Sequence, residues 1–500
     1  MLFSYFADKI NWANPGNKPT VKQVIRYISM KNNKKIQNAW CMYDWANSVY
    51  SLTITTAIFP SYYAAVMPER PDKVNFLGFE FYSSALYSFS LAAVFLLAAI
   101  LSPILTPIAD NTGKKKFFMQ MFCYLGSLGC AYLFFFHKDA GVLSQFTLTT
   151  SILAFILAGL GYSGSIVFYN SFLPEIATED QYDRLSARGF AMGYIGSVLL
   201  LIFNITMLTM PDLYFNVDGK VDELMASGLA NPEAKEQAKS FYSGLAARIS
   251  FLSVGIWWFL FAQYSFYYLP SNVYKKESQG NWLWSGFREL NKVLSEVRKE
   301  RYLKIFLPGF FFYNLGVQTV MYMAVIFAEG ELNLKMSELI IVILIIQLLA
   351  IVGANLSAKL SGKIGNISTL RYINMIWVLV CIAAYFVKTD VQFYGLAVVV
   401  GFIMGGVQSI SRSTYAKLIP EQTTDHASYF SFYDVAEKLS CFFGLFLFGA
   451  IEELTGSMRP STLTLGIIFI IGITFLSFIP SFKSYSGQTE LKLDHSGKNA

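Results

Sequence analysis

A single carboxylate, Asp44, lies in an otherwise apolar and aromatic stretch at residues 40–68, WCMYDWANSVYSLTITTAIFPSYYAAVMP. At 1.5 Å per residue, a helix of this length can cross the ~30 Å hydrocarbon core of a bilayer. An ionised carboxylate at the bilayer centre costs roughly 2.5–3.5 kcal/mol, so Asp44 must face protein or water. Tyr43, Asn47 and Tyr50 have helical spacing and form a polar, aromatic stripe. The stretch therefore predicts a membrane helix that lines a wet cavity.

Three carboxylates inside predicted membrane segments could load and unload a coupling proton: Asp44, Asp434 and Glu437. Asp434 and Lys438 are at i and i+4, so they can neutralise each other. Asp44 has no cation in its own segment. Arg188, at the start of a later segment, could pair with it and make it structural. The sequence leaves two roles possible for Asp44: a structural ion pair with Arg188, or a carrier of the coupling proton.

The composition excludes several other classes of protein. Hydrophobic residues make up 54% of the chain and charged residues 14%, against about 45–50% and 25% in soluble domains. The net charge of +6 is spread over many short loops, which does not favour nucleic-acid binding. The histidines and cysteines have neither metal-site spacing nor a nucleophile-and-base arrangement. No enzyme activity, metal or cofactor is expected.

The apolar runs predict twelve membrane-spanning helices in an all-α integral membrane protein. After residues 40–68, the predicted spans are 79–108, 117–136, 146–172, 189–210, 247–269, 305–327, 339–356, 372–387, 393–415, 429–450 and 463–482.

Loop charge predicts the orientation. With the N-terminus inside, 28 Lys and Arg residues fall on the cytoplasmic side and 10 on the other side, and Lys438 lies within a span. Positive residues stay on the cytoplasmic side, so both termini are expected there.

The order of the spans predicts two similar halves joined by a linker. The expected parts are a cytoplasmic segment at 1–39, a six-helix bundle at 40–269, a cytoplasmic linker at 270–304, a second six-helix bundle at 305–482 and a cytoplasmic tail at 483–500. The linker segment at 282–302 is basic and amphipathic, which favours a helix on the membrane surface.

Short matches relate the two halves. LPE at 173–175 resembles IPE at 419–421, and Tyr43-Asp44 resembles Tyr313-Asn314. A parallel repeat of six and six spans is typical of the major facilitator architecture.

The loop between the second and third spans, TPIADNTGKKKFF, resembles the loop signature of the major facilitator superfamily. Asp110, Gly113, Lys114, Lys115 and Lys116 match the signature, whereas Thr106 and Asn111 depart from it. Gly113 permits a tight turn, and Asp110 can meet the positive N-terminus of a neighbouring helix. The loop is either a cytoplasmic gate latch or only a turn that fixes topology.

Several longer segments resemble one branch of that superfamily, the vacuolar-effluxer-like branch, including its bacterial members. The segments are YDWANSVY (43–50), FYNSFLPEIA (168–177), SARGFAMGYIG (186–196), YNLGVQT (313–319) and FYDVAEK (432–438). The resemblance implies a secondary transporter with amino-acid export as the leading guess, in the cytoplasmic (inner) membrane of a bacterium. A monomer is expected, with the lipid bilayer, a small solute and protons as its partners.

In this architecture the first, fourth, seventh and tenth spans line the cavity. Their polar residues could each line it or only hydrogen-bond a neighbouring helix, an interaction worth about 0.6 kcal/mol on average. Arg412 could also be an interfacial anchor. The predicted cavity residues are Tyr43, Asn47, Tyr50, Tyr162, Ser165, Tyr169, Asn170, Asn314, Gln318, Gln408 and Ser411, and the predicted coupling or gating residues are Asp44, Asp110, Gly113, Lys114, Arg188, Asp434, Glu437 and Lys438.

The expected function is transport of a small polar organic solute by alternating access about a site between the halves. The alternative is a receptor or scaffold with the same fold that transports nothing.

Overall fold

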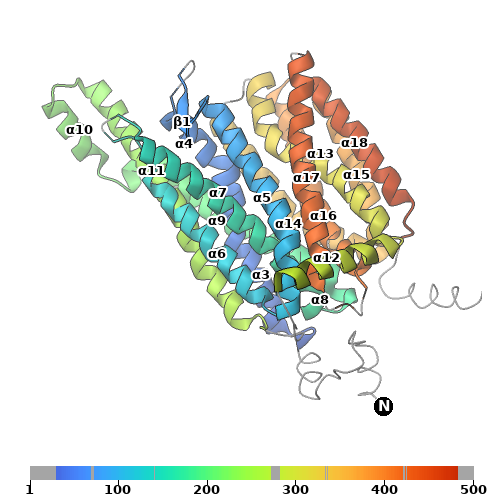
Figure 1. The fold of residues 1–500 in the computed structure, drawn as a ribbon. Coiled ribbons are helices and arrows are strands. Elements are labelled where there is room, and N and C mark those ends of the chain that lie inside the picture. The colour runs from blue at the N-terminus through green and yellow to red at the C-terminus, as the bar shows by residue number, and fades with distance from the viewer. Residues whose placement is uncertain are drawn as a thin grey trace, which may run out of the picture.

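The computed structural model describes residues 30–68, 72–139, 141–271, 282–332, 334, 336–420, 423, 425–455 and 457–481. Long helices dominate this part of the chain, and a two-stranded antiparallel hairpin follows the first helical segment (Figure 1). The all-α class predicted from the sequence is confirmed. The expected tail at 483–500 and most of the expected segment at 1–39 lie outside the described residues.

The first half of the chain contains the hairpin and the helices up to α11. The bounds are α3 (Lys34–Val49), η1 (Tyr50–Ala57), α4 (Phe59–Val66), β1 (Val74–Phe76), β2 (Phe79–Phe81), α5 (Ser83–Thr112), α6 (Lys115–Tyr132), η2 (Leu133–Phe135), α7 (Gln145–Ser171), α8 (Leu173–Ile176), η3 (Glu179–Gln181), α9 (Tyr182–Thr209), η4 (Pro211–Leu213), α10 (Val217–Ala226) and α11 (Asn231–Tyr268).

The second half consists of long helices preceded by the linker helix α12. The bounds are α12 (Trp282–Lys299), α13 (Leu303–Leu332), α14 (Met336–Ile364), α15 (Asn366–Phe386), α16 (Asp390–Leu418), α17 (His426–Thr455) and α18 (Arg459–Ser477).

The stretch at 40–68 is not one regular helix. Its middle, η1, is a π-helix of 8 residues between α3 and α4. A π-helix turns its side chains by less than 100° per residue, so the faces of α3 and α4 do not continue each other. The uniform helical stripe expected from the sequence is therefore interrupted at Tyr50.

The described helices form two groups that follow the order of the chain. In the first group α3 packs against α9 and α11, and α6 packs against α7 and α11. In the second group α13 packs against α17 and α18, and α14 packs against α16. The groups meet where α5 contacts α17 and where α9 contacts α14 and α16. Helix α12 contacts α5, α13 and α17, and so touches both groups at one end of the molecule (Figure 1).

Within the described residues, 9 helical segments are long and apolar enough to cross a membrane. They are Phe89–Thr112, Lys115–Phe135, Gln145–Ile176, Glu179–Thr209, Asn231–Tyr268, Ile341–Ile364, Asn366–Phe386, Asp390–Leu418 and Arg459–Ser477. The spans expected at 40–68, 305–327 and 429–450 are helical but are not among the nine, so the count of twelve stays a prediction.

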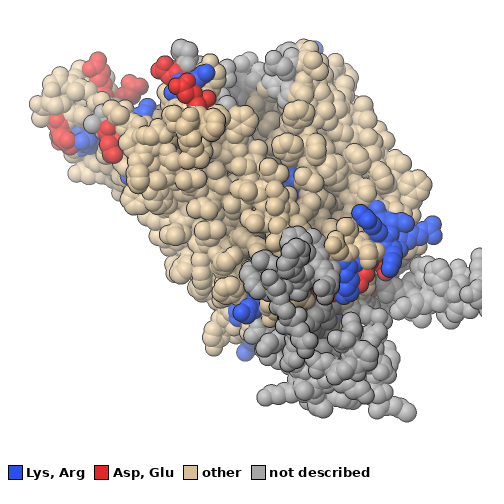
Figure 2. All heavy atoms as spheres, viewed as in Figure 1, with Lys and Arg blue, Asp and Glu red and all other residues tan. Residues whose placement is uncertain are grey.

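The charged side chains on the face shown in Figure 2 gather at the two ends of the molecule. Most acidic residues lie around α10 and the β1–β2 hairpin, and a cluster of basic residues lies around α12, with a broad band between them that carries almost no charge. Because a hydrocarbon core excludes charge, this band is the surface that fits a lipid bilayer.

Close helix contacts depend on glycine at several positions. Gly189 and Gly196 of α9 lie against α3: an added Cβ would come 2.6 Å from Asp44 Oδ2 and 2.7 Å from the Trp45 carbonyl oxygen, respectively. In the second half, an added Cβ at Gly353 of α14 would overlap the Phe402 carbonyl of α16. Small residues let membrane helices approach this closely.

We predict that Gly353→Ala lowers stability by about 1–3 kcal/mol, because the new methyl group must push α14 away from the α16 backbone. Thermal unfolding of the purified protein in detergent measures this change. Gly362→Ala in the same helix is the matched control, since nothing lies within 4 Å of the added Cβ. It should leave stability unchanged or slightly raised. Equal effects of the two substitutions would contradict the packing argument.

Candidate functional site

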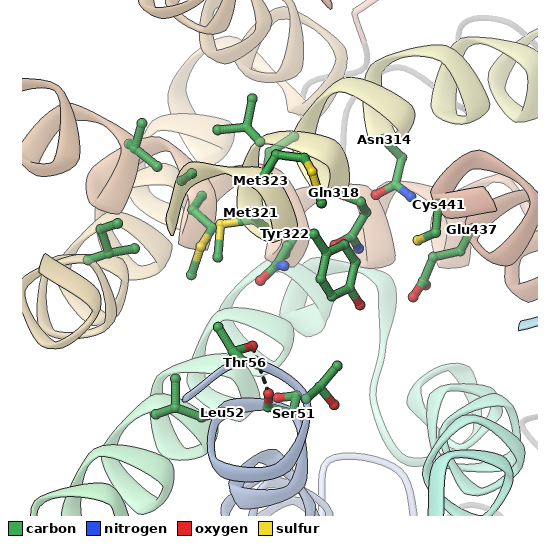
Figure 3. Close-up of a pocket in the computed structure, with 18 of the residues that line it drawn as sticks. Ser51, Leu52, Thr56, Asn314, Gln318, Met321, Tyr322, Met323, Glu437 and Cys441 are labelled. Carbon is green, nitrogen blue, oxygen red and sulfur yellow. Dashed lines mark hydrogen bonds between the residues drawn. The ribbon is translucent and has the colours of Figure 1, made fainter. Parts of the chain in front are cut away.

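A cavity of about 310 Å³ lies between the two groups of helices. Figure 3 shows Asn314, Gln318 and Tyr322 of α13 across the cavity from Ser51 and Thr56 of η1, and Glu437 of α17 points toward the same space. The cavity is mainly apolar, with polar and charged groups from both halves among its lining residues. Such a site can bind a small molecule with a few polar groups.

The structure places most of the predicted site residues around this cavity. The predicted residues that line it are Tyr50, Tyr162, Asn170, Asn314, Gln318, Gln408 and Ser411, together with Asp44, Glu437 and Lys438.

Four predicted cavity residues are instead buried behind the wall: Tyr43, Asn47, Ser165 and Tyr169. Tyr43 packs with Tyr169 and Phe266 inside the first half. The face of α3 and η1 that meets the cavity is displaced by one residue, to Asp44, Ser48, Ser51 and Thr55. The spacing i, i+4, i+7 and i+11 from Asp44 could have indicated this face.

The floor of the cavity is an ion pair between the two halves. Asp44 of α3 is 4% exposed, and its Oδ2 lies 3.3 Å from both Nη1 and Nη2 of Arg412 in α16. The Tyr169 hydroxyl donates to the same oxygen at 2.6 Å. Arg412 also donates to the Ser186 hydroxyl at 2.9 Å and to the Ser186 carbonyl at 2.8 Å. Its guanidinium group lies 4.1 Å from the centre of the Phe190 ring.

This geometry corrects two expectations. Arg188, the expected partner of Asp44, is exposed. Arg412 is 3% exposed, which rules out an anchor at the membrane interface. The sequence favoured Arg188 because it lies near the end of a span, whereas Arg412 is 368 positions from Asp44 and reaches it only across the bundle interface.

The last turn of α5 brings Asp110 to the first turn of α17. Its carboxylate accepts hydrogen bonds from the Ser428 N–H and hydroxyl, both at 2.7 Å, and from the Ala427 N–H at 3.3 Å. A carboxylate at a helix N-terminus is stabilised by the free N–H groups and the helix dipole. Gly113 ends α5 with a φ of +69°, which glycine adopts without strain. Lys114 is exposed. The buried cation is Lys115, whose Nζ lies 3.0 Å from Asp110 and also donates to Glu175.

A second carboxylate, Asp183, also links the two halves, through α14, α15 and α16. Asp183, in the first turn of α9, accepts from Ser361 at 2.8 Å, from Asn366 at 2.7 Å and from Lys417 at 2.8 Å. No motif in the sequence pointed to Asp183. In the last turn of α14, Gly362 occupies the place of the acid in the repeated motif.

Helix α17 carries a buried charged group beside the cavity. Lys438 Nζ lies 3.6 Å from Asp434 Oδ1 and 3.1 Å from Glu437 Oε1. The ion pair expected between Asp434 and Lys438 is present, and Lys438 is also the partner that the sequence left unknown for Glu437. In the described part of the chain, no group of three or more His, Cys, Asp or Glu residues could hold a metal ion.

Comparison with solved structures identifies the class of protein. The structure matches the fucose:proton symporter FucP in the outward conformation, with a TM-score of 0.61 and 14% identity over 92% of this chain and 100% of that chain. It also matches the proton:xylose symporter XylE, with a TM-score of 0.62 and 14% identity over 89% of this chain and 96% of that chain. The chain therefore has the major facilitator fold, as predicted.

The particular family follows from sequence. The profile described as "Vacuole effluxer Atg22 like" matches residues 32–488. A relative from Bacillus subtilis (strain 168), the "Uncharacterized MFS-type transporter YxiO", is 31% identical over 90% of this chain and 96% of the relative. "Autophagy-related protein 22" of Coccidioides immitis (strain RS) is 24% identical over 78% of this chain and 71% of the relative. This chain belongs to the Atg22-like vacuole effluxer family and is a membrane transporter of the major facilitator type.

We predict that Arg412→Gln destabilises the protein by about 3–5 kcal/mol, because it leaves the buried Asp44 without its cation. Thermal unfolding in detergent measures the loss. The double variant Asp44→Asn/Arg412→Gln should recover part of the stability, since no charge then remains uncompensated. Arg188→Gln is the control and should change stability by less than about 0.5 kcal/mol. A larger loss of stability from Arg188→Gln than from Arg412→Gln would instead support Arg188 as the partner of Asp44.

Proposed function

We propose that this protein moves a small polar organic solute across the membrane by alternating access, driven by coupled protons. The observation that carries the proposal is the cavity between the two halves, with charged groups of both signs at its wall and floor. Among the described residues, hydrogen bonds between the halves come from the cavity floor and from the end near α12. This arrangement supports a state in which one end is closed.

The chemistry of the cavity supports a zwitterionic solute, with an amino acid as the leading candidate. Arg412 and Lys438 offer cationic groups, and Asp44 and Glu437 offer carboxylates. A zwitterion could exchange partners with these pairs without leaving a buried charge alone. The resemblance to vacuolar effluxers supports amino-acid export, and the family description "vacuole effluxer" supports the direction.

The same proposal includes the membrane, the orientation and the oligomeric state of the protein. We place the chain as a monomer in the cytoplasmic membrane of a bacterium, with both termini and α12 on the cytoplasmic side. The two groups of helices are then the six-helix bundles at 40–269 and 305–482. The bacterial relative supports the membrane, and the excess of Lys and Arg in the cytoplasmic loops supports the orientation.

Alternating access gives the Asp110 loop a role as a latch. Asp110 belongs to the first half and the first turn of α17 to the second, so their contact exists only while this end is closed. Gly113 shapes the turn, and Lys115 rather than Lys114 neutralises the buried carboxylate.

We predict that Asp110→Asn favours the state open at the α12 end, because it removes charge-assisted hydrogen bonds worth about 1.5–3 kcal/mol. The distance between spin labels on α5 and α17, measured by electron paramagnetic resonance, should lengthen. The substitution should lower the transport rate more than the affinity for solute, since Asp110 does not line the cavity. Weaker binding with an unchanged distance distribution would contradict the latch.

The transport proposal is tested in proteoliposomes that contain the purified protein. Radiolabelled amino acids should show counterflow, and an imposed pH gradient should drive their accumulation. Organic acids, amines and sugars serve as the comparison solutes. Absence of flux for every class, with a protein that is folded and correctly inserted, would favour the receptor or scaffold.

A further inference from the structure

One membrane helix, α17, carries two carboxylates that share one ammonium group. Asp434, Glu437 and Lys438 lie within about one turn, and Lys438 is 4% exposed. Two carboxylates and one ammonium leave one negative charge when all three are ionised. An uncompensated charge inside a low-dielectric protein costs several kcal/mol. Asp434, Glu437 and Lys438 together therefore need one further positive charge to be neutral.

The two carboxylates differ in their surroundings. The Glu437 side chain is 23% exposed, lines the cavity and accepts the 3.1 Å hydrogen bond from Lys438. The Asp434 side chain is 4% exposed, and its Oδ1 lies 3.6 Å from Lys438. Neither Asp434 oxygen has a hydrogen-bond donor among the described residues. Glu437 can therefore remain ionised, whereas Asp434 has only the more distant Lys438 ammonium and the hydroxyl of Ser102 beside it, few donors for a buried ionised carboxylate.

A second unpartnered group lies beside Asp434. Ser102 of α5 is 5% exposed, and its hydroxyl also lacks a hydrogen-bond partner within the described parts of the chain. It faces the Asp434 carboxylate from the opposite half of the protein. A protonated Asp434 can donate a hydrogen bond to this hydroxyl oxygen, and the bound proton also removes the excess negative charge of the group.

Among the described residues, the other ionisable groups around α17 do not supply the missing charge. Tyr162 of α7 and Tyr322 of α13 face Lys438 and Glu437, and both are neutral when protonated. Asp110 of α5 and Lys292 and Glu296 of α12 contact the α17 end near residues 425–429, whereas Asp434 is more than a turn further along the helix. In α18, Arg459 is paired with Glu331. Arg412 is engaged with Asp44.

We propose that Asp434 is a proton-binding site at the contact between α5 and α17, and that it holds the coupling proton of the transporter. This inference rests on the proposed function. When α5 and α17 move apart, Asp434 loses Ser102 as its neighbour. The proton then leaves as H⁺ to water in the cavity, next to Glu437 and Lys438, and the Asp434 carboxylate is left paired with Lys438.

A sodium ion is the other small cation to consider. Small hard cations are held by about six oxygen ligands. In the described part of the chain, the unpartnered side-chain oxygens at this site are the two of Asp434 and the Ser102 hydroxyl. A proton needs only one donor and one acceptor, so the geometry favours a proton over a metal cation.

Infrared difference spectroscopy of the purified protein in lipid nanodiscs tests the site without a transport substrate. A pH titration of the wild-type protein should show a carboxylic-acid C=O band that is present at acidic pH and lost as the pH rises. Asp434→Asn should abolish this band, whereas Glu437→Gln should move its loss to lower pH, because Lys438 alone then balances the Asp434 carboxylate. Glu331→Gln is the control, because that carboxylate is ion-paired outside the cavity.

Ser102→Ala is a second variant that keeps the proposal testable if Asp434→Asn fails to fold. It should shift the frequency of the band without removing it, because the hydrogen bond from the acid is lost. A full band in folded Asp434→Asn, or an unshifted band in Ser102→Ala, would overturn the proposal. So would a sodium-dependent change in protein fluorescence that Asp434→Asn abolishes. Because the infrared measurement needs no solute, a failure of the proton-site proposal can be told apart from an absence of flux in proteoliposomes.

Discussion

Charge neutralisation across the interface between the halves is the constraint on which the rest of the structure depends. The Arg412 guanidinium comes from the second half, and among the described residues it donates to Asp44, Asn170 and Ser186, which all belong to the first. A buried ion pair adds little net stability, but removing one partner costs about 3–5 kcal/mol. The pair therefore acts on conformation more than on stability, because it is complete only when α3, α9 and α16 are together.

The same rule accounts for the two carboxylates at the α12 end. Asp110 extends from the first half to the first turn of α17, and Asp183 extends from the first half to α14, α15 and Lys417. The repeated loop motif of the second half lacks an acid, since Gly362 stands in its place. Asp183 supplies a carboxylate to that end of α14 from the opposite half. Both acids thus belong to the first half, and both depend on donors from the second.

The sequence predicted those features that depend on neighbouring residues in the chain. Apolar runs indicated the helices, and the turn at Gly113 followed from its motif. Partners far apart in sequence could not be predicted in the same way. Asp44 was assigned to Arg188 instead of Arg412 because only a folded structure shows which cation crosses the interface. The cavity face was displaced by one residue, from Asn47 to Ser48, because a broad polar stripe does not fix the rotation of a helix and the π-helix after Val49 leaves no regular pattern.

The positions of the charged contacts limit how the closed end can open. Asp110 and Asp183 lie near the end of the molecule, where water can replace their donors as the halves separate. The Asp44–Arg412 pair lies deeper, at the cavity floor, where both side chains are at most 6% exposed. Separating that pair requires new partners inside the membrane, because desolvated charges cost several kcal/mol each. A bound solute with charged groups could provide such partners. In the proposed transport cycle, occupation of the cavity would thus be linked to opening of the end beneath it.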